Sequence, residues 1–236
     1  MNKRFYQIRV SWNEKILKRR GGPQSVSITT RGFFSKYYPR LCEWRWKDYF
    51  TDRDGFYQRI PVPLTGKLWY KGPIDFMDAC YNRKGMVACV NNKVKDIFCD
   101  LKVNPREYVL HPIEIQNEHD VFYVMFIPFL SIKELRIDYN RTLFDYAPWP
   151  DVLERYFSGG QELQDYLSDI NNPLRTKRLV IDQSLSNRDI INAGYIHGDI
   201  YFSERIIQAF REREVIGYEV DDSPNICPLS FSDVHI

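Results

Sequence analysis

Hydrophobic and polar positions follow the same order twice along this chain, about 112 residues apart. Residues 85–98 read as a short apolar strand followed by an amphipathic helix, and residues 198–210 repeat that order. The residue before each helix is a capping type, Asn91 in the first copy and Ser203 in the second. Both side chains accept hydrogen bonds from the free N–H groups of a first helical turn. The pattern therefore predicts two copies of a strand, a capped helix and a second strand.

The spacing of apolar residues supports the first of these helices. Val94, Ile97 and Phe98 recur at intervals of three and one, which places them on one face of a helix. Each predicted helix is followed by a strand, over residues 108–115 in the first copy and 217–220 in the second.

The rest of the chain alternates between strand signals and turn residues. Residues 117–120 are turn-forming and separate residues 108–115 from an apolar run at 121–128, which predicts an antiparallel hairpin. Further strands are predicted over 6–12, 25–30 and 179–182, and helices over 74–81 and 161–170. The fold class is therefore α+β, with a mixed, mainly antiparallel sheet and a twice-occurring strand–capped helix–strand unit.

Length and pattern predict two regions. Residues 1–78 form a basic region rich in strands and turns, and residues 79–236 form the α+β region with the repeated unit. One continuous domain of residues 1–236 fits the length equally well.

Cysteine usage and hydropathy indicate a cellular compartment. The five cysteines form no C-x-x-C pair, which argues against a disulfide framework or a structural zinc site and fits a reducing environment. The first ten residues contain no apolar core typical of a secretory signal. The longest apolar run, residues 121–130, is too short to span a bilayer. We therefore expect a cytoplasmic protein that does not insert into membranes.

Charge is distributed unevenly, although the whole chain carries only +2. Residues 1–50 hold twelve Lys and Arg against three acids, which leaves −7 on the remaining residues. Residues 143–172 hold six acids against one arginine. Such asymmetry bears on partners and association rates and not on the fold.

Known catalytic motifs are missing from the sequence. It contains no G-x-G-x-x-G, no G-x-x-x-x-G-K-[ST], no H-E-x-x-H and no G-x-S-x-G. We therefore assign no catalytic, cofactor-binding or metal-binding residue. An enzyme remains an alternative, with an active site assembled around His197, Asp199 and His111.

Two segments have the composition of a binding surface. Residues 15–47 interleave Lys and Arg with Phe, Tyr and Trp, which suits nucleic acid, although a pI near 8.2 weakens that alternative. The second segment combines acids with Tyr and Trp and would suit a basic protein partner, because charges steer the encounter and aromatic rings anchor it. Its candidate partner-binding residues are Asp145, Tyr146, Trp149, Asp151, Glu154, Tyr156, Glu162 and Asp165.

The order of these segments resembles a known family. Residues 108–115, 135–144, 179–182, 198–205 and 217–220 stand in an order similar to that in immunity proteins of bacterial polymorphic toxin systems. The resemblance is to the branch long catalogued as a domain of unknown function with repeated V-S-E-R, helix and G-x-E-F modules. It covers about residues 79–222, and the first copy departs from it by carrying Val90-Asn-Asn-Lys93 in place of Ser-Glu-Arg.

This resemblance implies a role without catalysis. Such a protein would bind one cognate toxin tightly in the cytoplasm and block its active site, with no cofactor. The resemblance carries over no catalytic residue, and it implies that Ser203, Glu204 and Arg205 determine the fold.

Overall fold

The computed structural model describes most of the chain, in several stretches. These are residues 4–17, 24–33, 55, 58–60, 62–70, 72–79, 86–145, 156–168, 175–194, 200–221 and 228–233. Contacts divide the chain into two compact units. Unit 1 comprises Met1–Ile8, Phe129–Glu204 and Val220–Ile236, and unit 2 comprises Arg9–Pro128 and Arg205–Glu219. Both units therefore take residues from before and after residue 78.

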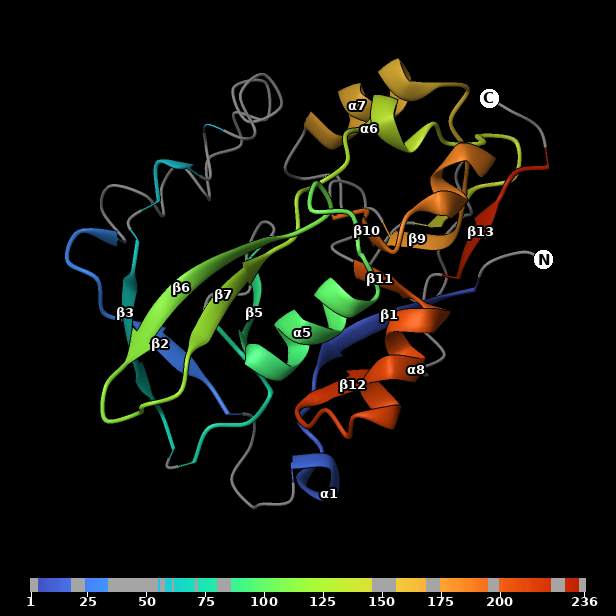
Figure 1. Cartoon of the computed structure of the whole chain (residues 1–236). Coiled ribbons are helices and arrows are strands. Elements are labelled where there is room, and N and C mark those ends of the chain that lie inside the picture. Colours follow the sequence, from blue (N-terminus) through green and yellow to red (C-terminus); the bar gives the residue numbers. More distant parts are fainter. Residues whose placement is uncertain are drawn as a thin grey trace. The chain divides into compact units, whose positions relative to one another are not determined.

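Unit 2 is built on a six-stranded sheet with the strand order β2-β3-β6-β7-β5-β4 (Figure 1). The strands are β2 (Val26–Ile28), β3 (Leu64–Leu68), β4 (Phe76–Met77), β5 (Met86–Asn91), β6 (Val109–Ile115) and β7 (Phe122–Phe126). Only β3 and β6 are parallel neighbours, and the other pairs are antiparallel. The hairpin predicted from the turn at residues 117–120 is confirmed as β6 and β7.

The two end strands of this sheet also meet each other. Ser25, just before β2, forms a parallel bridge with Asp78, just after β4. The Val26 N–H donates to the Asp78 carbonyl and the Asp78 N–H donates to the Gln24 carbonyl, both at 2.8 Å. The sheet is thus closed on itself, so that one face of every strand points into a common interior.

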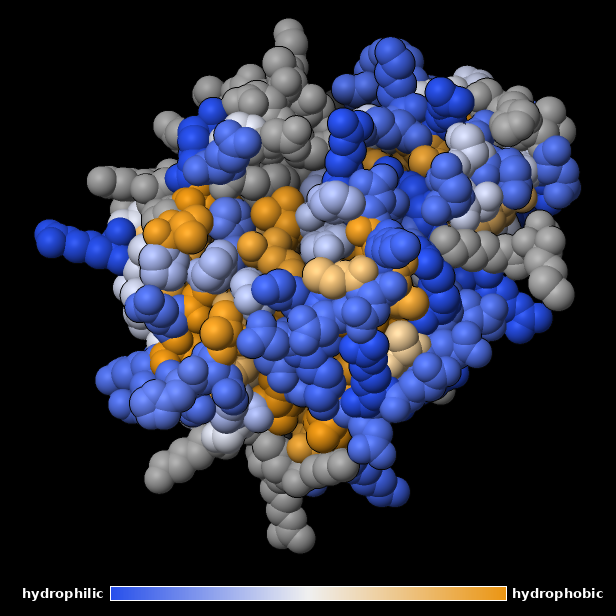
Figure 2. All heavy atoms as spheres, viewed as in Figure 1, coloured by the Kyte–Doolittle hydropathy of each residue, from blue (hydrophilic) through white to orange (hydrophobic). Residues whose placement is uncertain are grey.

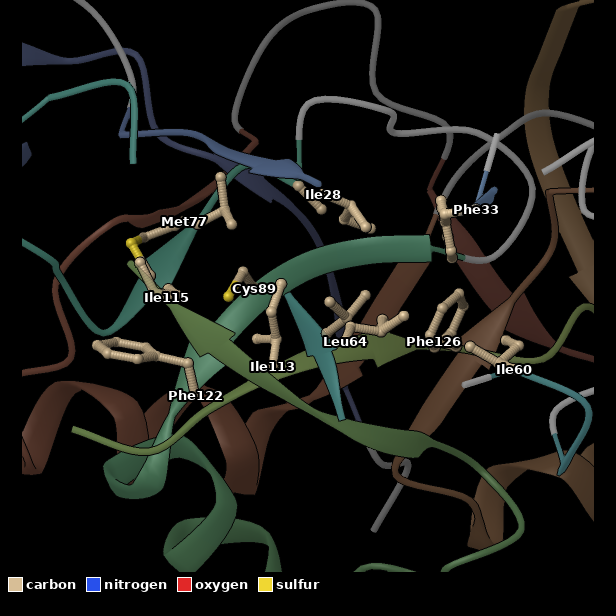
Figure 3. Packing of buried hydrophobic residues seen from close by; sticks show 13 residues of the cluster. Ile28, Phe33, Ile60, Leu64, Met77, Cys89, Ile113, Ile115, Phe122 and Phe126 are labelled. Atoms are coloured by element: carbon tan, nitrogen blue, oxygen red, sulfur yellow. The ribbon is translucent and has the colours of Figure 1, made fainter. Parts of the chain in front are cut away.

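That interior holds the main core of unit 2. Figure 3 shows side chains from different strands, among them Leu64, Ile113 and Phe126, pointing toward one another. These residues alternate with outward-facing ones along each strand, as the two-residue period of a strand requires. Outside the sheet, hydrophilic atoms cover α5 (Asn92–Asp100), and hydrophobic atoms reach the surface over β6 and β7 (Figure 2).

The helix predicted over residues 74–81 is wrong. Phe76 and Met77 form strand β4, pair with Val90 and Cys89 of β5, and are both fully buried. Eight residues give few helical hydrogen bonds, so burial of these two side chains against β5 decides the local structure.

Unit 1 contains a second, smaller core. Its three-stranded sheet has the order β13-β9-β8, and its helices lie beside it (Figure 1). The elements are α6 (Ile132–Leu135), β8 (Leu143–Asp145), α7 (Gly160–Ser168), β9 (Arg175–Ile181), the 3-10 helix η2 (Gln183–Asn187) and β13 (Leu229–Phe231). The core includes Leu135, Phe144, Leu163 and Ile181. The helix predicted over 161–170 is confirmed as α7.

A four-stranded sheet has the order β10-β11-β1-β12. Its strands are β1 (Phe5–Val10), β10 (Ile190–Asn192), β11 (Ile200–Ser203) and β12 (Tyr218–Val220), and the short helix α1 (Glu14–Leu17) follows β1. Residues 5–8 of β1 belong to unit 1 and residues 9 and 10 to unit 2. With these sheets and helices, the protein has an α+β fold with mostly antiparallel strands.

The strand–helix–strand order predicted twice from the sequence is present, as β5, α5 and β6 and as β11, the helix over Glu204–Glu212 and β12. The predicted cap is confirmed for Asn91, whereas the Ser203 hydroxyl donates to Asp189 Oδ1 at 2.8 Å. The strand that precedes each unit is also equivalent, and the modules defined next include it. We call β4, β5 and α5 module A, and β10, β11 and α8 (Glu204–Glu212) module B. In both modules a nine-residue helix starts immediately after the strand. Asn91 ends β5, and its side chain accepts a hydrogen bond from the Val94 N–H, as expected of a cap.

The two helices also end in the same way. Lys102 and Glu214, two residues after each helix, both have positive φ, at 52° and 49°. The next residue then donates its N–H back to the helix, from Val103 to the Phe98 carbonyl at 2.9 Å and from Val215 to the Phe210 carbonyl at 2.8 Å. This left-handed termination is common at helix C-termini, and its recurrence at the same offset extends the repeat beyond the helices.

Candidate functional site

The structure describes part of the predicted acidic surface. Tyr156, Glu162 and Asp165 are among its described residues and lie close in sequence at the start of α7. The backbone of Asp145 ends β8, opposite Arg175 of β9. The other predicted partner-binding residues, Tyr146, Trp149, Asp151 and Glu154, lie outside the described residues.

Phe157 anchors the segment before α7 in the core of unit 1. Its side chain is only 3% exposed. It packs edge-on against Phe144 of β8, with ring centroids 5.2 Å apart, and against Tyr166 of α7, at 5.4 Å. The adjacent Tyr156 is 59% exposed. A buried aromatic residue therefore holds the backbone from which an exposed tyrosine projects.

Hydrogen bonds at the N-terminus define where α7 begins. The Glu162 carboxylate accepts from the Ser158 N–H at 2.7 Å and from the Ser158 hydroxyl at 2.8 Å. An acid in the first turn is also favoured by the helix dipole. Glu162 thus has a structural role in addition to its negative charge.

The N-terminal end of α7 also packs closely against neighbouring side chains. A Cβ atom added at Gly160 would lie 3.1 Å from the Tyr139 hydroxyl and 3.2 Å from Ile132 of α6. The glycine therefore allows α7 to approach Tyr139 closely. Burial raises the pKa of Tyr139 to about 12, so this hydroxyl stays protonated at neutral pH.

The outward side of α7 is polar and acidic. Asp165 accepts from Gln161 Nε2 at 2.7 Å, one helical turn away, and both side chains are exposed. On the opposite side Leu163 is fully buried. We define the Tyr156–α7 surface as the exposed residues Tyr156, Gln161, Glu162, Gln164 and Asp165. It combines one aromatic side chain with two negative charges.

The structure describes one of the three residues of the enzyme alternative. His111 lies in β6, is 6% exposed and packs edge-on against Phe126, with ring centroids 5.4 Å apart. The two-residue period of β6 places it on the same face of the strand as Ile113 and Ile115, which belong to the core of unit 2. His197 and Asp199 lie outside the described residues. Within the described ranges, no three His, Cys, Asp or Glu side chains gather as metal ligands would.

The basic N-terminal surface is described only in part. Lys15 and Arg31 are exposed, whereas Phe33 is fully buried in the core of unit 2 and offers no ring for stacking on a base. Residues 18–20 and 34–47, which supply most of its cations and aromatic rings, lie outside the described residues.

Sequence reasoning missed three exposed aromatic side chains of unit 2. Trp12, Trp69 and Tyr70 are 69%, 62% and 44% exposed. Trp69 directly follows β3, and its indole N–H donates to the Ser27 hydroxyl of the neighbouring strand β2 at 2.5 Å. The alternation of β3 contained the signal: Leu64 points inward, so position 69 falls on the outer face.

No model of a known protein family matches this chain, and no curated protein sequence matches it significantly. Within the described residues, no helix has both the length and the apolar character needed to cross a bilayer.

Proposed function

We propose that this protein is a non-enzymatic immunity protein that binds a basic cognate toxin in the cytoplasm and neutralises it. The observation that carries the proposal is the Tyr156–α7 surface, in which an exposed tyrosine beside a buried anchor adjoins an acidic helix face. The resemblance of the chain to immunity proteins supports the same function.

The physical properties of this surface suit a protein partner. A tyrosine on a fixed backbone loses little conformational entropy on binding and contributes a large contact area. Glu162 and Asp165 attract a basic partner over roughly one Debye length, about 8 Å at physiological salt. Their charges therefore raise the association rate, while Tyr156 slows dissociation.

A capture experiment followed by a functional assay tests the proposal. Tagged full-length protein is used to isolate its partner from a lysate of the source cells, and the partner is identified by mass spectrometry. The purified partner should be toxic when expressed alone and harmless when this protein is expressed with it. A captured partner whose activity and toxicity are unchanged by the protein contradicts the neutralising function.

Two variants with matched controls test the surface itself. Tyr156→Ala should weaken binding roughly 30-fold, since aromatic anchors contribute about 2 kcal/mol or more. Asp165→Lys should slow association and reduce its salt dependence. The controls are Tyr70→Ala, which removes an exposed tyrosine of unit 2, and Asp120→Lys, which makes the same charge change in the turn between β6 and β7. Equal affinity of all four variants would locate the interface elsewhere.

A further inference from the structure

Modules A and B each have an equivalent hydrogen bond from a tyrosine of the neighbouring strand. In module A the Tyr123 hydroxyl of β7 donates to Asn92 Oδ1 at 3.1 Å. In module B the Tyr6 hydroxyl of β1 donates to Glu204 Oε1 at 3.2 Å. Asn92 and Glu204 are the first residues of α5 and α8. The two tyrosines therefore hold equivalent positions.

Strand register supports the same equivalence. Asn91, the last residue of β5, pairs with Phe122, and Ser203, the last residue of β11, pairs with Phe5. In each case the tyrosine follows the paired phenylalanine. β7 begins Phe-Tyr-Val-Met and β1 begins Phe-Tyr-Gln-Ile, so both strands open with the same two residues in the same register.

The strands on the other side of each module also correspond. Asp75 precedes β4, and its carbonyl accepts from the Asn91 N–H at 3.2 Å. Asp189 precedes β10, and its carbonyl accepts from the Ser203 N–H at 2.8 Å. Both carboxylates accept a second bond from the same partner residue, from Asn91 Nδ2 at 2.7 Å and from the Ser203 hydroxyl at 2.8 Å. The sequences Asp-Phe-Met-Asp-Ala (75–79) and Asp-Ile-Ile-Asn-Ala (189–193) repeat this relation.

The strand orders agree across both modules. In the first, β4-β5-β7-β6 are neighbours in that order, and in the second, β10-β11-β1-β12 are. β6 follows α5 in the chain and β12 follows α8, so each helix leads to the equivalent outer strand. β7 follows β6 directly, whereas the next strand after β12 among the described residues is β13, which pairs with β9. The place that β7 fills in the first sheet is thus filled by β1, the first strand of the chain.

We propose that β1 is a strap that completes module B: residues 5–10 are the missing fourth strand of an internally duplicated fold, seated between β11 and β12. The space between β11 and β12 is therefore a binding site for a β-strand, and residues 5–10 of this chain occupy it. This inference does not depend on the proposed function.

The contacts of β1 are those of a central strand and not of a frayed terminus. On one side the Glu204 N–H donates to the Arg4 carbonyl at 2.9 Å, and on the other the Asp221 N–H donates to the Gln7 carbonyl at 3.0 Å. Ile8 is only 6% exposed. Further along, Arg9 Nε forms an ion pair with Glu219 at 2.6 Å.

A cleavable full-length protein tests whether the strap is a separable strand. A recognition site for a sequence-specific protease is inserted between Arg20 and Gly21, and the folded protein is cleaved. The small fragment should remain bound in gel filtration and separate only in denaturing urea. After its removal, a synthetic peptide of residues 4–17 should bind the large fragment and restore its cooperative melting.

Two altered peptides provide the matched comparison. Ile8→Asp places a charge in a buried position and should weaken peptide binding about 100-fold or more. Trp12→Ser changes a side chain that is 69% exposed and should leave the affinity nearly unchanged. If the Ile8→Asp peptide binds as tightly as the unaltered peptide, the proposal is overturned. It is also overturned if the small fragment dissociates under native conditions and the melting temperature of the large fragment equals that of the uncut protein.

Hydrogen exchange on the uncut full chain gives an independent measurement if the insertion prevents folding. The hydrogen-bonded amides of Phe5–Ile8 should exchange as slowly as those of Phe122–Met125, the equivalent segment of β7. Exchange of the β1 amides within seconds, at the rate of an unstructured terminus, overturns the proposal.

Discussion

Helices α5 and α8 of the repeated modules meet through equivalent residues. Phe98 and Phe210 are both fully buried, and their rings stack with centroids 6.2 Å apart and an interplanar angle of 12°. Each ring also packs edge-on against a tyrosine that follows its helix, with ring centroids 4.9 Å apart for Tyr108, just before β6, and 5.0 Å apart for Tyr218, the first residue of β12. The stack is therefore the centre of an aromatic cluster to which both modules contribute.

Replacing these phenylalanines by leucine removes the ring contact while retaining an apolar side chain. Phe98→Leu and Phe210→Leu should each lower the free energy of unfolding by about 1 to 3 kcal/mol, a range typical of altered core packing. Stacked aromatic pairs contribute about 0.5 to 1.5 kcal/mol beyond burial of their area. The loss of unfolding free energy in the double variant should therefore be smaller than the sum of the losses in the two single variants. The difference should be about 0.5 to 1.5 kcal/mol.

Urea denaturation of the wild type, both single variants and the double variant measures this coupling. Ile28→Val, in the interior of the closed sheet, replaces Phe210→Leu in a control cycle. The control should be additive within about 0.3 to 0.5 kcal/mol, as expected of independent sites. If the stability losses of Phe98→Leu and Phe210→Leu are equally additive, the stacked contact between the two helices contributes no coupling energy to stability. That result would refute the reasoning.

Three further predictions concern single residues. Gly217→Ala should cost about 3 kcal/mol or more in unfolding free energy, because φ is +108° and a Cβ would lie 2.0 Å from the Phe76 carbonyl oxygen; Gly72→Ala, at φ +83° with no atom within 4 Å, should cost only about 1 to 2 kcal/mol. Iodoacetamide labelling followed by peptide mass spectrometry should modify exposed Cys99 in the folded protein and buried Cys89 only after unfolding. Burial raises the pKa of the Cys89 thiol above its ordinary value of 9.0, so its contribution to stability is complete below pH 9 and is lost as pH rises above it; the urea midpoint should fall less steeply above pH 9 in Cys89→Ala.

Local sequence signals predicted the parts of the fold that are held by local contacts. The capping residue Asn91 and the helix after it lie within one short segment, and so does the turn that joins β6 to β7. In both cases the hydrogen bonds that define the element connect residues close in sequence. Periodicity and turn chemistry report such bonds directly.

The closure of the sheet in unit 2 had no comparable signal. It depends on the backbone of Asp78 bonding to residues 24 and 26, about fifty positions earlier in the chain. Backbone groups bond in this way whatever their side chains are, so the pairing leaves little trace in the residue types. Phe76 and Met77 form a strand where the sequence favoured a helix because they pair with Val90 and Cys89 of β5.

The candidate site was predicted by composition, and its geometry required the fold. Acids and aromatic residues near 156–165 were visible in the sequence, but the pattern does not show that Phe157 points into the core while Tyr156 points outward. Nor does composition separate Glu162, which accepts hydrogen bonds from Ser158 at the start of α7, from Asp165, which accepts from Gln161 one helical turn away. Burial and hydrogen bonding make these distinctions.

The strap illustrates how sequence separation limits such predictions. The Tyr6–Glu204 bond joins residues 198 positions apart, whereas its counterpart, Tyr123–Asn92, spans 31. The two bonds have similar lengths, 3.2 Å and 3.1 Å, and the same place in their modules, although one acceptor is a carboxylate oxygen and the other an amide oxygen. The order of the strands along the chain differs, and a search for repeats that assumes one constant offset overlooks the N-terminal copy of Phe-Tyr. A repeat whose last strand comes first in the chain can be recognised only when register and strand order are compared together.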